Sequence, residues 1–134
     1  MKQEAGKSNK EPSQAPQPPY YAVIFTSELS DNNDGYEATA QRMLELAAQQ
    51  PGFLGVETAR DDALGITVSY WQDLASIAAW RDNIEHREAR QRGRKQWYRR
   101  FTLRIAKVER AVEFEMDDTG HEKLSSRSLS GLTV

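Results

Sequence analysis

The chain has 134 residues, no cysteine and a formal net charge of -2. This length suits one domain with a buried core, and the near-balanced charge gives no overall attraction to nucleic acid or to an anionic membrane. The lack of cysteine excludes disulfides, thiolate zinc sites and a cysteine nucleophile. No run approaches the roughly 20 apolar residues of a membrane span and no signal peptide is recognisable, so we expect a cytoplasmic protein.

Both ends of the chain have compositions that do not favour a packed core. Residues 1–19 are rich in Pro, Gln, Ser and Lys and have few large apolar side chains, which predicts a flexible N-terminal extension. Residues 115–134 are polar, Ser-rich and weakly patterned, which predicts a loose tail open to contact with a second subunit. The folded domain is therefore expected to span residues 20–114.

The first half of this domain is predicted to form a strand, a helix and a hairpin. Residues 20–26 alternate with apolar groups on both faces, which is typical of an interior strand. Residues 36–47 carry an apolar face at helical spacing, and Pro51-Gly52 ends that helix. Residues 53–60 and 65–71 have the period-two pattern of strands, and the short polar loop between them predicts an antiparallel hairpin.

A break in the second helix decides where His86 lies. Asp73 can cap a helix that begins just after it. In an unbroken helix, His86 would lie about 180° from Ile77, on the wet side. If the helix instead restarts with Asn83 as a new cap, His86 begins an apolar stripe that ends at Trp97 and faces a cavity.

The last strand completes a ferredoxin-like pattern. It runs from Tyr98 to about Val112, and its apolar phase slips by one residue, which predicts a β-bulge near residues 105–107. The order βαββαβ is typical of an α+β fold in which helices cover one face of an antiparallel sheet. The other face would expose a large apolar patch, so we expect a homodimer that packs sheet against sheet.

Three motifs resemble the antibiotic biosynthesis monooxygenase family. They are the segment Pro51-Gly52-Phe53-Leu54-Gly55, the strand that ends in Tyr70-Trp71, and Trp80 followed six residues later by His86. The resemblance covers about residues 20–114. It implies a dimeric α+β barrel with a cavity between each subunit's sheet and its helices. It also implies oxidation of polycyclic aromatic phenols by O2 with no metal, flavin or other cofactor, in which the electron-rich substrate anion itself reduces oxygen.

The haem-degrading branch of the same superfamily fits this chain less well. Trp80 matches the helix tryptophan of that branch. Ser27, however, stands where the branch has an asparagine, and Arg90 stands where it has the haem-ligating histidine. Because two of three positions depart from the pattern, haem degradation is not expected.

Cofactor-free oxygenation needs a base that forms the substrate phenolate and a dry aromatic cavity that holds it near O2. His86 is the only side chain of the expected core whose unperturbed pKa lies near neutrality, which makes it the candidate catalytic residue. The alternative is that His86 caps a helix and that the aromatic residues simply fill the core. The candidate substrate-binding residues combine aromatic rings with hydrogen-bond donors: Trp71, Trp80, Asn83, Trp97 and Tyr98.

Eight Lys and Arg residues crowd into residues 81–100. This basic cluster either attracts RNA or an anionic substrate, or is the solvated side of a helix with carboxylates at pairing distance. The domain lacks the interleaved exposed aromatic residues of single-strand binders, so we expect no nucleic-acid partner. Asp117, Asp118 and His121 offer too few ligands, in a tail, to predict a metal site.

Three functions remain open on the sequence alone. The first is a monooxygenase for a small aromatic phenol or quinol, which predicts oxygen uptake. The second is a binding or stress-response module of the same fold, which predicts stabilisation by an aromatic ligand without turnover. The third is a nucleic-acid binder, which predicts affinity that falls steeply with salt.

Overall fold

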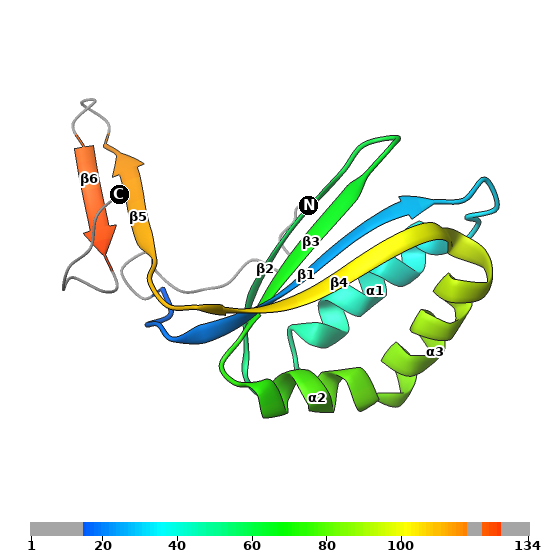
Figure 1. The fold of residues 1–134 in the computed structure, drawn as a ribbon, viewed down its shortest axis with the longest axis horizontal. Helices are drawn as coiled ribbons and strands as arrows, with labels where there is room; N and C mark the ends of the chain where they lie inside the picture. The colour runs from blue at the N-terminus through cyan, green and yellow to red at the C-terminus, as the bar shows by residue number, and fades with distance from the viewer. Residues whose placement is uncertain (1–14, 118–121, 127–134) are drawn as a thin grey trace.

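The computed structural model describes residues 15–117 and 122–126. Most of the expected N-terminal extension, residues 1–14, therefore lies outside the described residues. The elements follow one another in this order (Figure 1): β1 (Tyr20–Leu29), α1 (Tyr36–Ala47), β2 (Phe53–Arg60), β3 (Gly65–Trp71), α2 (Leu74–Asp82), α3 (Ile84–Arg92), the π-helical turn η2 (Gly93–Trp97), β4 (Tyr98–Val108), β5 (Val112–Met116) and β6 (Glu122–Ser126).

Four strands form one antiparallel sheet in the order β2-β3-β1-β4. β1 is an interior strand, as predicted, with β3 on one side and β4 on the other. Helices α1, α2 and α3 lie on the same face of the sheet (Figure 1). This arrangement confirms the predicted ferredoxin-like α+β fold.

The core lies between this sheet and the helices. Trp71 from β3 is fully enclosed and packs with Ala47 of α1 and Ile77 of α2. Tyr21 and Val23 of β1 pack against the same cluster, which shows that their side of the strand faces the helices. Successive side chains of a strand point to opposite sides of the sheet. The other half of each strand's residues therefore lies on the side away from the helices, here called the uncovered face.

One aspartate cap and one asparagine cap set where α2 and α3 begin, as the sequence predicts. The carboxylate of Asp73 accepts a hydrogen bond from the backbone N–H of Ser76 at 2.8 Å, which begins α2. The Oδ1 of Asn83 accepts one from the backbone N–H of His86 at 3.0 Å, which begins α3. Each bond satisfies a backbone donor that the helix itself leaves unpaired. The predicted helix break at Asn83 is confirmed.

The predicted β-bulge near residues 105–107 is wrong. β4 pairs with β1 in unbroken register there, with Val23 opposite Ile105 and Tyr21 opposite Lys107. The irregularity lies at the other end of the pair, between Glu28 and Leu29. The apolar phase changes because β4 carries apolar side chains on both of its faces, and a sequence pattern cannot separate that case from an inserted residue.

The C-terminal part of the described chain differs from the loose tail that was expected. β5 and β6 pair as a separate antiparallel sheet that stands away from the four-stranded sheet (Figure 1). Phe114 and Met116, which alternate along β5, are more than half exposed. Residues 118–121 and 127–134 lie outside the described residues. None of the described helices is long and apolar enough to cross a membrane.

Candidate functional site

Four of the six predicted site residues lie together where β3 ends and α2 passes into α3. The indole of Trp71 is stacked on that of Trp80, with ring centroids 6.2 Å apart and planes at 23°. The imidazole of His86 is stacked on Trp80 with centroids 4.0 Å apart and planes at 11°. Asn83 turns the chain between the two helices through its cap on His86. We call Trp71, Trp80 and His86 the His86 stack.

The environment of His86 favours a neutral ring with one defined tautomer. Its Nδ1 lies 2.9 Å from the carbonyl oxygen of Trp80. Because a carbonyl only accepts, Nδ1 carries the proton of the neutral ring and Nε2 keeps its lone pair. Burial lowers the pKa of His86 below its usual value, the bond to the Trp80 carbonyl raises it, and the charge of Arg90 lowers it. Nε2 can therefore accept a proton at neutral pH.

The other two predicted residues, Trp97 and Tyr98, belong to a second ring cluster. Both rings contact Tyr36 of α1 edge to face, with centroids 5.8 Å away in each case. The Nε1 of Trp97 donates to the carbonyl oxygen of Asp34 at 2.9 Å. Burial raises the pKa of the Tyr98 phenol, as does its contact with Tyr36. No ring contact joins this cluster to the His86 stack within the described part of the chain.

Glycine at position 93 is what allows this second cluster to close. A Cβ atom built at Gly93 would lie 2.6 Å from a ring carbon of Tyr98, closer than any real contact. The close neighbour at Gly93 is the Tyr98 ring, at the start of β4.

Sequence reasoning missed Arg60, the last residue of β2. Its guanidinium lies over the ring of Tyr36, 5.4 Å from the centroid, and donates a hydrogen bond to the Oγ of Ser27. Ser27 is buried, with 2% of its surface exposed. Gly65, opposite Arg60 on β3, leaves room for the guanidinium, because a Cβ there would clash with it. The only sign of this in the sequence is a basic residue at a strand position whose side chain faces the helices.

An apolar stripe also remains open on the helix-facing side of β4. Ile105 pairs with Val23, which packs on the core, so Ile105 and its alternating neighbours face the helices. These neighbours, Phe101 and Leu103, are 37% and 49% exposed, and Ile105 is 49% exposed. The ring centroids of Phe25 and Phe101 lie 5.3 Å apart. We call these three residues of β4 the β4 stripe.

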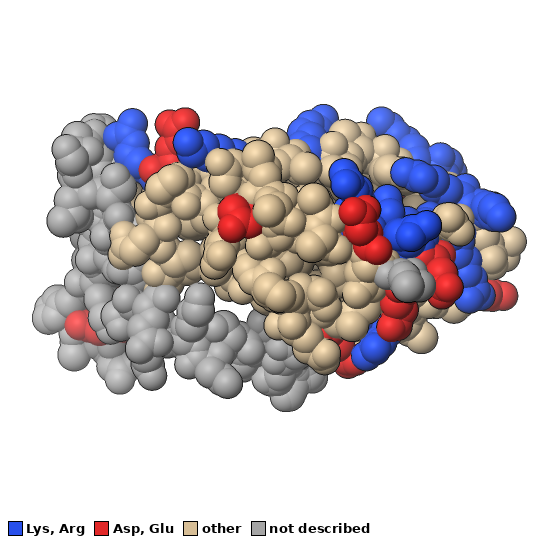
Figure 2. Space-filling view, turned by 90° about the horizontal axis from the view of Figure 1, so that it is seen from below, with Lys and Arg blue, Asp and Glu red and all other residues tan. Residues whose placement is uncertain are grey.

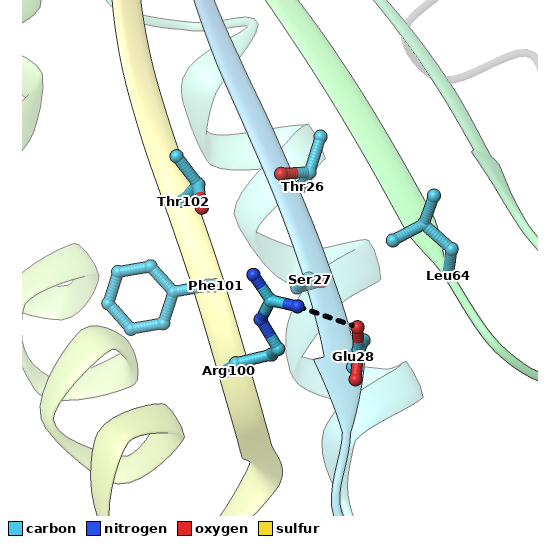
Figure 3. Close-up of a pocket in the computed structure, with 7 residues that line it drawn as sticks. All are labelled: Thr26, Ser27, Glu28, Leu64, Arg100, Phe101 and Thr102. Carbon is cyan, nitrogen blue, oxygen red and sulfur yellow. Dashed lines mark hydrogen bonds and ion pairs between the residues drawn. The ribbon is translucent and has the colours of Figure 1, made fainter.

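A shallow pocket lies at the end of β1 and β4, and none of the six predicted residues lines it (Figure 3). Thr26 and Thr102 pair across the two strands on the uncovered face, and Arg100 reaches Glu28 at 3.4 Å. The pocket is lined by Thr26, Ser27, Glu28, Leu64, Arg100, Phe101 and Thr102. Arg100 and Glu28 pair with each other in this lining, and we assign the pocket as a whole no chemistry.

Lys and Arg side chains gather toward the end of the molecule where α3 and η2 lie, with carboxylates among them (Figure 2). Arg42 of α1 pairs with Glu85 of α3 at 2.7 Å, and Arg81 pairs with Asp82 at 3.2 Å. This mixture is typical of a solvated helix face. Among the described residues, no three His, Cys, Asp or Glu side chains are grouped so that they could hold a metal ion.

Comparison with known proteins places this fold in a family. Residues 19–92 match the profile of the family described as antibiotic biosynthesis monooxygenase. The uncharacterized protein YqjZ of Bacillus subtilis (strain 168) is 53% identical over 104 residues, which covers 77% of this chain and 91% of YqjZ.

Two solved structures show the same fold at low identity. SnoaB, a cofactor-independent oxygenase from Streptomyces nogalater, has a TM-score of 0.61 and 12% identity over 70% of this chain and 97% of its own. Rv0793 from Mycobacterium tuberculosis has a TM-score of 0.59 and 11% identity over 65% of this chain and 92% of its own. The family profile spans more than half of the sequence. The chain therefore belongs to the antibiotic biosynthesis monooxygenase family.

Proposed function

We propose that this protein is a cofactor-independent monooxygenase that oxidises a small aromatic phenol or quinol with O2. The observation that carries the proposal is the His86 stack, in which a neutral imidazole keeps Nε2 free beside aromatic surfaces. Membership of the family supports it. SnoaB, which shares the fold, is itself described as a cofactor-independent oxygenase.

His86 is the proposed general base. Its Nε2 takes the proton of the phenol O–H and leaves an electron-rich phenolate. The phenolate gives one electron to O2, and the two radicals join in a new C–O bond at a ring carbon that carries hydrogen. Loss of that hydrogen as a proton and cleavage of the O–O bond then yield a quinone and water. The substrate supplies all four electrons that O2 needs, so the reaction requires no reductant.

The other predicted site residues have two proposed roles. Trp80 and Asn83 are partly exposed beside His86 and are assigned to direct contact with the reacting ring of the substrate, and Tyr98, partly exposed in the second ring cluster, is assigned to contact with a more distant part of it. Asn83 uses its Oδ1 as a helix cap, which leaves its amide N–H groups to donate to a quinone oxygen. Trp71, at 0% exposed, is assigned to the wall behind the His86 stack, and Trp97, at 2% exposed, to the wall of the second ring cluster.

A homodimer packed through the uncovered face is the proposed assembly. Ile66 pairs with Thr26 on this face and is 42% exposed, and Leu64 beside it is similarly exposed. An apolar patch on a sheet is well covered by the same patch of a second copy, related by a twofold axis.

A binding module without turnover is the second candidate. The β4 stripe favours it, since three exposed apolar side chains can hold an aromatic ligand without any base. The two candidates differ in oxygen consumption.

The experiment that tests the proposed base compares wild-type protein with His86→Gln and with Glu88→Gln, an exposed change on the same helix. Oxygen uptake is followed with a panel of phenols and quinols, and thermal shift reports binding. We expect His86→Gln to lose at least about 100-fold in rate, as for a general base, while ligand stabilisation persists. Equal rates in all three proteins would contradict the role of His86.

A further inference from the structure

One row of residues crosses the helix-facing side of the sheet at the level of Arg60. Arg60 of β2 is opposite Gly65 of β3, Gly65 is opposite Ser27 of β1, and Ser27 is opposite Phe101 of β4. Paired residues of antiparallel strands lie on the same face, so a cation, a buried hydroxyl and an exposed aromatic ring follow one another in this row.

Arg60 forms no close ion pair with its described neighbours, although the carboxylate of Asp61, next in the chain, acts on its charge at longer range. No carboxylate lies within 4.0 Å of its guanidinium among residues 15–117, and the adjacent Asp61 uses its Oδ1 to accept from the backbone N–H groups of Ala63 and Leu64. One terminal nitrogen donates to Ser27, and within the same residues the other nitrogens have no hydrogen-bond partner. Arg60 is itself exposed, so a ligand can reach these nitrogens.

Two contacts hold this guanidinium in place. Its Cζ lies over the ring of Tyr36, and the absence of a side chain at Gly65 leaves space for it against the sheet. Cation–π packing and a fixed hydrogen bond reduce the freedom that an arginine loses when it binds an anion. A planar guanidinium with free N–H groups matches the two oxygens of a carboxylate.

The β4 stripe continues from this row. Phe101 lies in the row itself, and Leu103 and Ile105 follow on the same side of β4. A positive end and an apolar stripe on one surface are complementary to a molecule with an acidic head and an apolar body.

We infer that Arg60 and Ser27 form an anion-binding subsite at the end of the β4 stripe, and that it takes the carboxylate of an aromatic carboxylic acid. The guanidinium binds the two carboxylate oxygens while Ser27 holds its orientation. The ring system of the ligand lies along Phe101 and Leu103. This binding does not depend on oxygen chemistry, so the subsite serves a monooxygenase and a binding module alike.

The test measures binding of two probes of similar shape, 2-naphthoate and the neutral 2-naphthalenemethanol, by isothermal titration. Wild-type protein is expected to bind the naphthoate at least about tenfold more tightly, since a hydrogen bond to a charged group has that value or more. Arg60→Gln removes this preference, and Arg60→Lys keeps part of it. Ser27→Ala weakens naphthoate binding by about threefold to tenfold, as for a lost hydrogen bond.

The matched control is Arg87→Gln, which makes the same change in net charge at an exposed position of α3, outside the subsite and outside the uncovered face. It is expected to leave both affinities unchanged. The inference is overturned if neither probe binds wild-type protein, if both bind equally, or if Arg60→Gln binds naphthoate as wild type does. It is also overturned if Arg87→Gln weakens binding as much as Arg60→Gln, because the effect is then one of overall charge.

Discussion

Trp80 holds His86 in two ways at once. The two rings are stacked with centroids 4.0 Å apart, and the backbone carbonyl of Trp80 lies 2.9 Å from the imidazole Nδ1. The stack fixes the plane of the ring and the hydrogen bond fixes its rotation and tautomer. Nε2 is left as the proton acceptor, and the proposed chemistry depends on this relationship.

The stack also contributes to stability. Trp80→Ala removes the ring between Trp71 and His86 and is expected to lower the free energy of unfolding by about 3 kcal/mol, as for large aromatic truncations. The measurement is urea unfolding. The control is Leu74→Ala on the same helix, because Leu74 is 52% exposed. This variant is expected to change the free energy of unfolding by less than about 0.5 kcal/mol. Similar losses in both variants would show that the stack does not stabilise the fold.

The titration of His86 is expected to shift toward acid. Burial lowers its folded-state pKa below the ordinary histidine value of about 6.5, so between these two pKa values the unfolded chain binds more protons than the folded one. Stability is therefore full above about pH 6.5 and falls as pH drops toward the folded pKa. NMR of the ring protons, with His86→Gln to assign the signal, measures this pKa directly. A pKa at or above 6.5 would contradict the burial argument.

Two glycines offer a matched test of packing. Gly93→Ala places a methyl group against the Tyr98 ring and is expected to cost about 1–3 kcal/mol, as overpacking does. Gly55→Ala meets no atom within 4 Å and is expected to be neutral or slightly stabilising, because alanine restricts the unfolded chain. Thermal unfolding compares the two. A neutral Gly93→Ala would mean that Tyr98 can move away.

The proposed dimer is tested by a charge on the uncovered face. Ile66→Asp buries a carboxylate in the interface and is expected to give a monomer in sedimentation velocity runs, because an unpaired buried charge is costly. Leu74→Asp changes an exposed apolar residue on a helix, 52% exposed against 42% for Ile66, and is expected to leave the dimer intact. A wild-type monomer, or an intact Ile66→Asp dimer, would remove the proposal.

The sequence predicts the elements of this fold well because their signals are local. Asp73 and Asn83 act as caps through bonds to residues three positions ahead, so the helix break could be read directly from the chain. The β-bulge failed because alternation alone does not show which face of β4 is buried.

The candidate site was less accessible to sequence reasoning. The bond between His86 and the Trp80 carbonyl depends on the angle between two helices, and the position of Arg60 depends on the register of three strands. Neither arises from a pattern within one segment. The second ring cluster around Tyr36 likewise joins α1 to residues more than 60 positions away.

We propose that this protein oxidises an aromatic phenol or quinol with O2 and no added cofactor. The most direct measurement uses purified, chelator-treated protein with a phenol or quinol panel under ¹⁸O2, and follows oxygen consumption and product mass together. We expect consumption of one O2 per product and incorporation of one ¹⁸O atom into the quinone. Ligand-induced stabilisation with no oxygen uptake would contradict it and would leave the protein as a binding module.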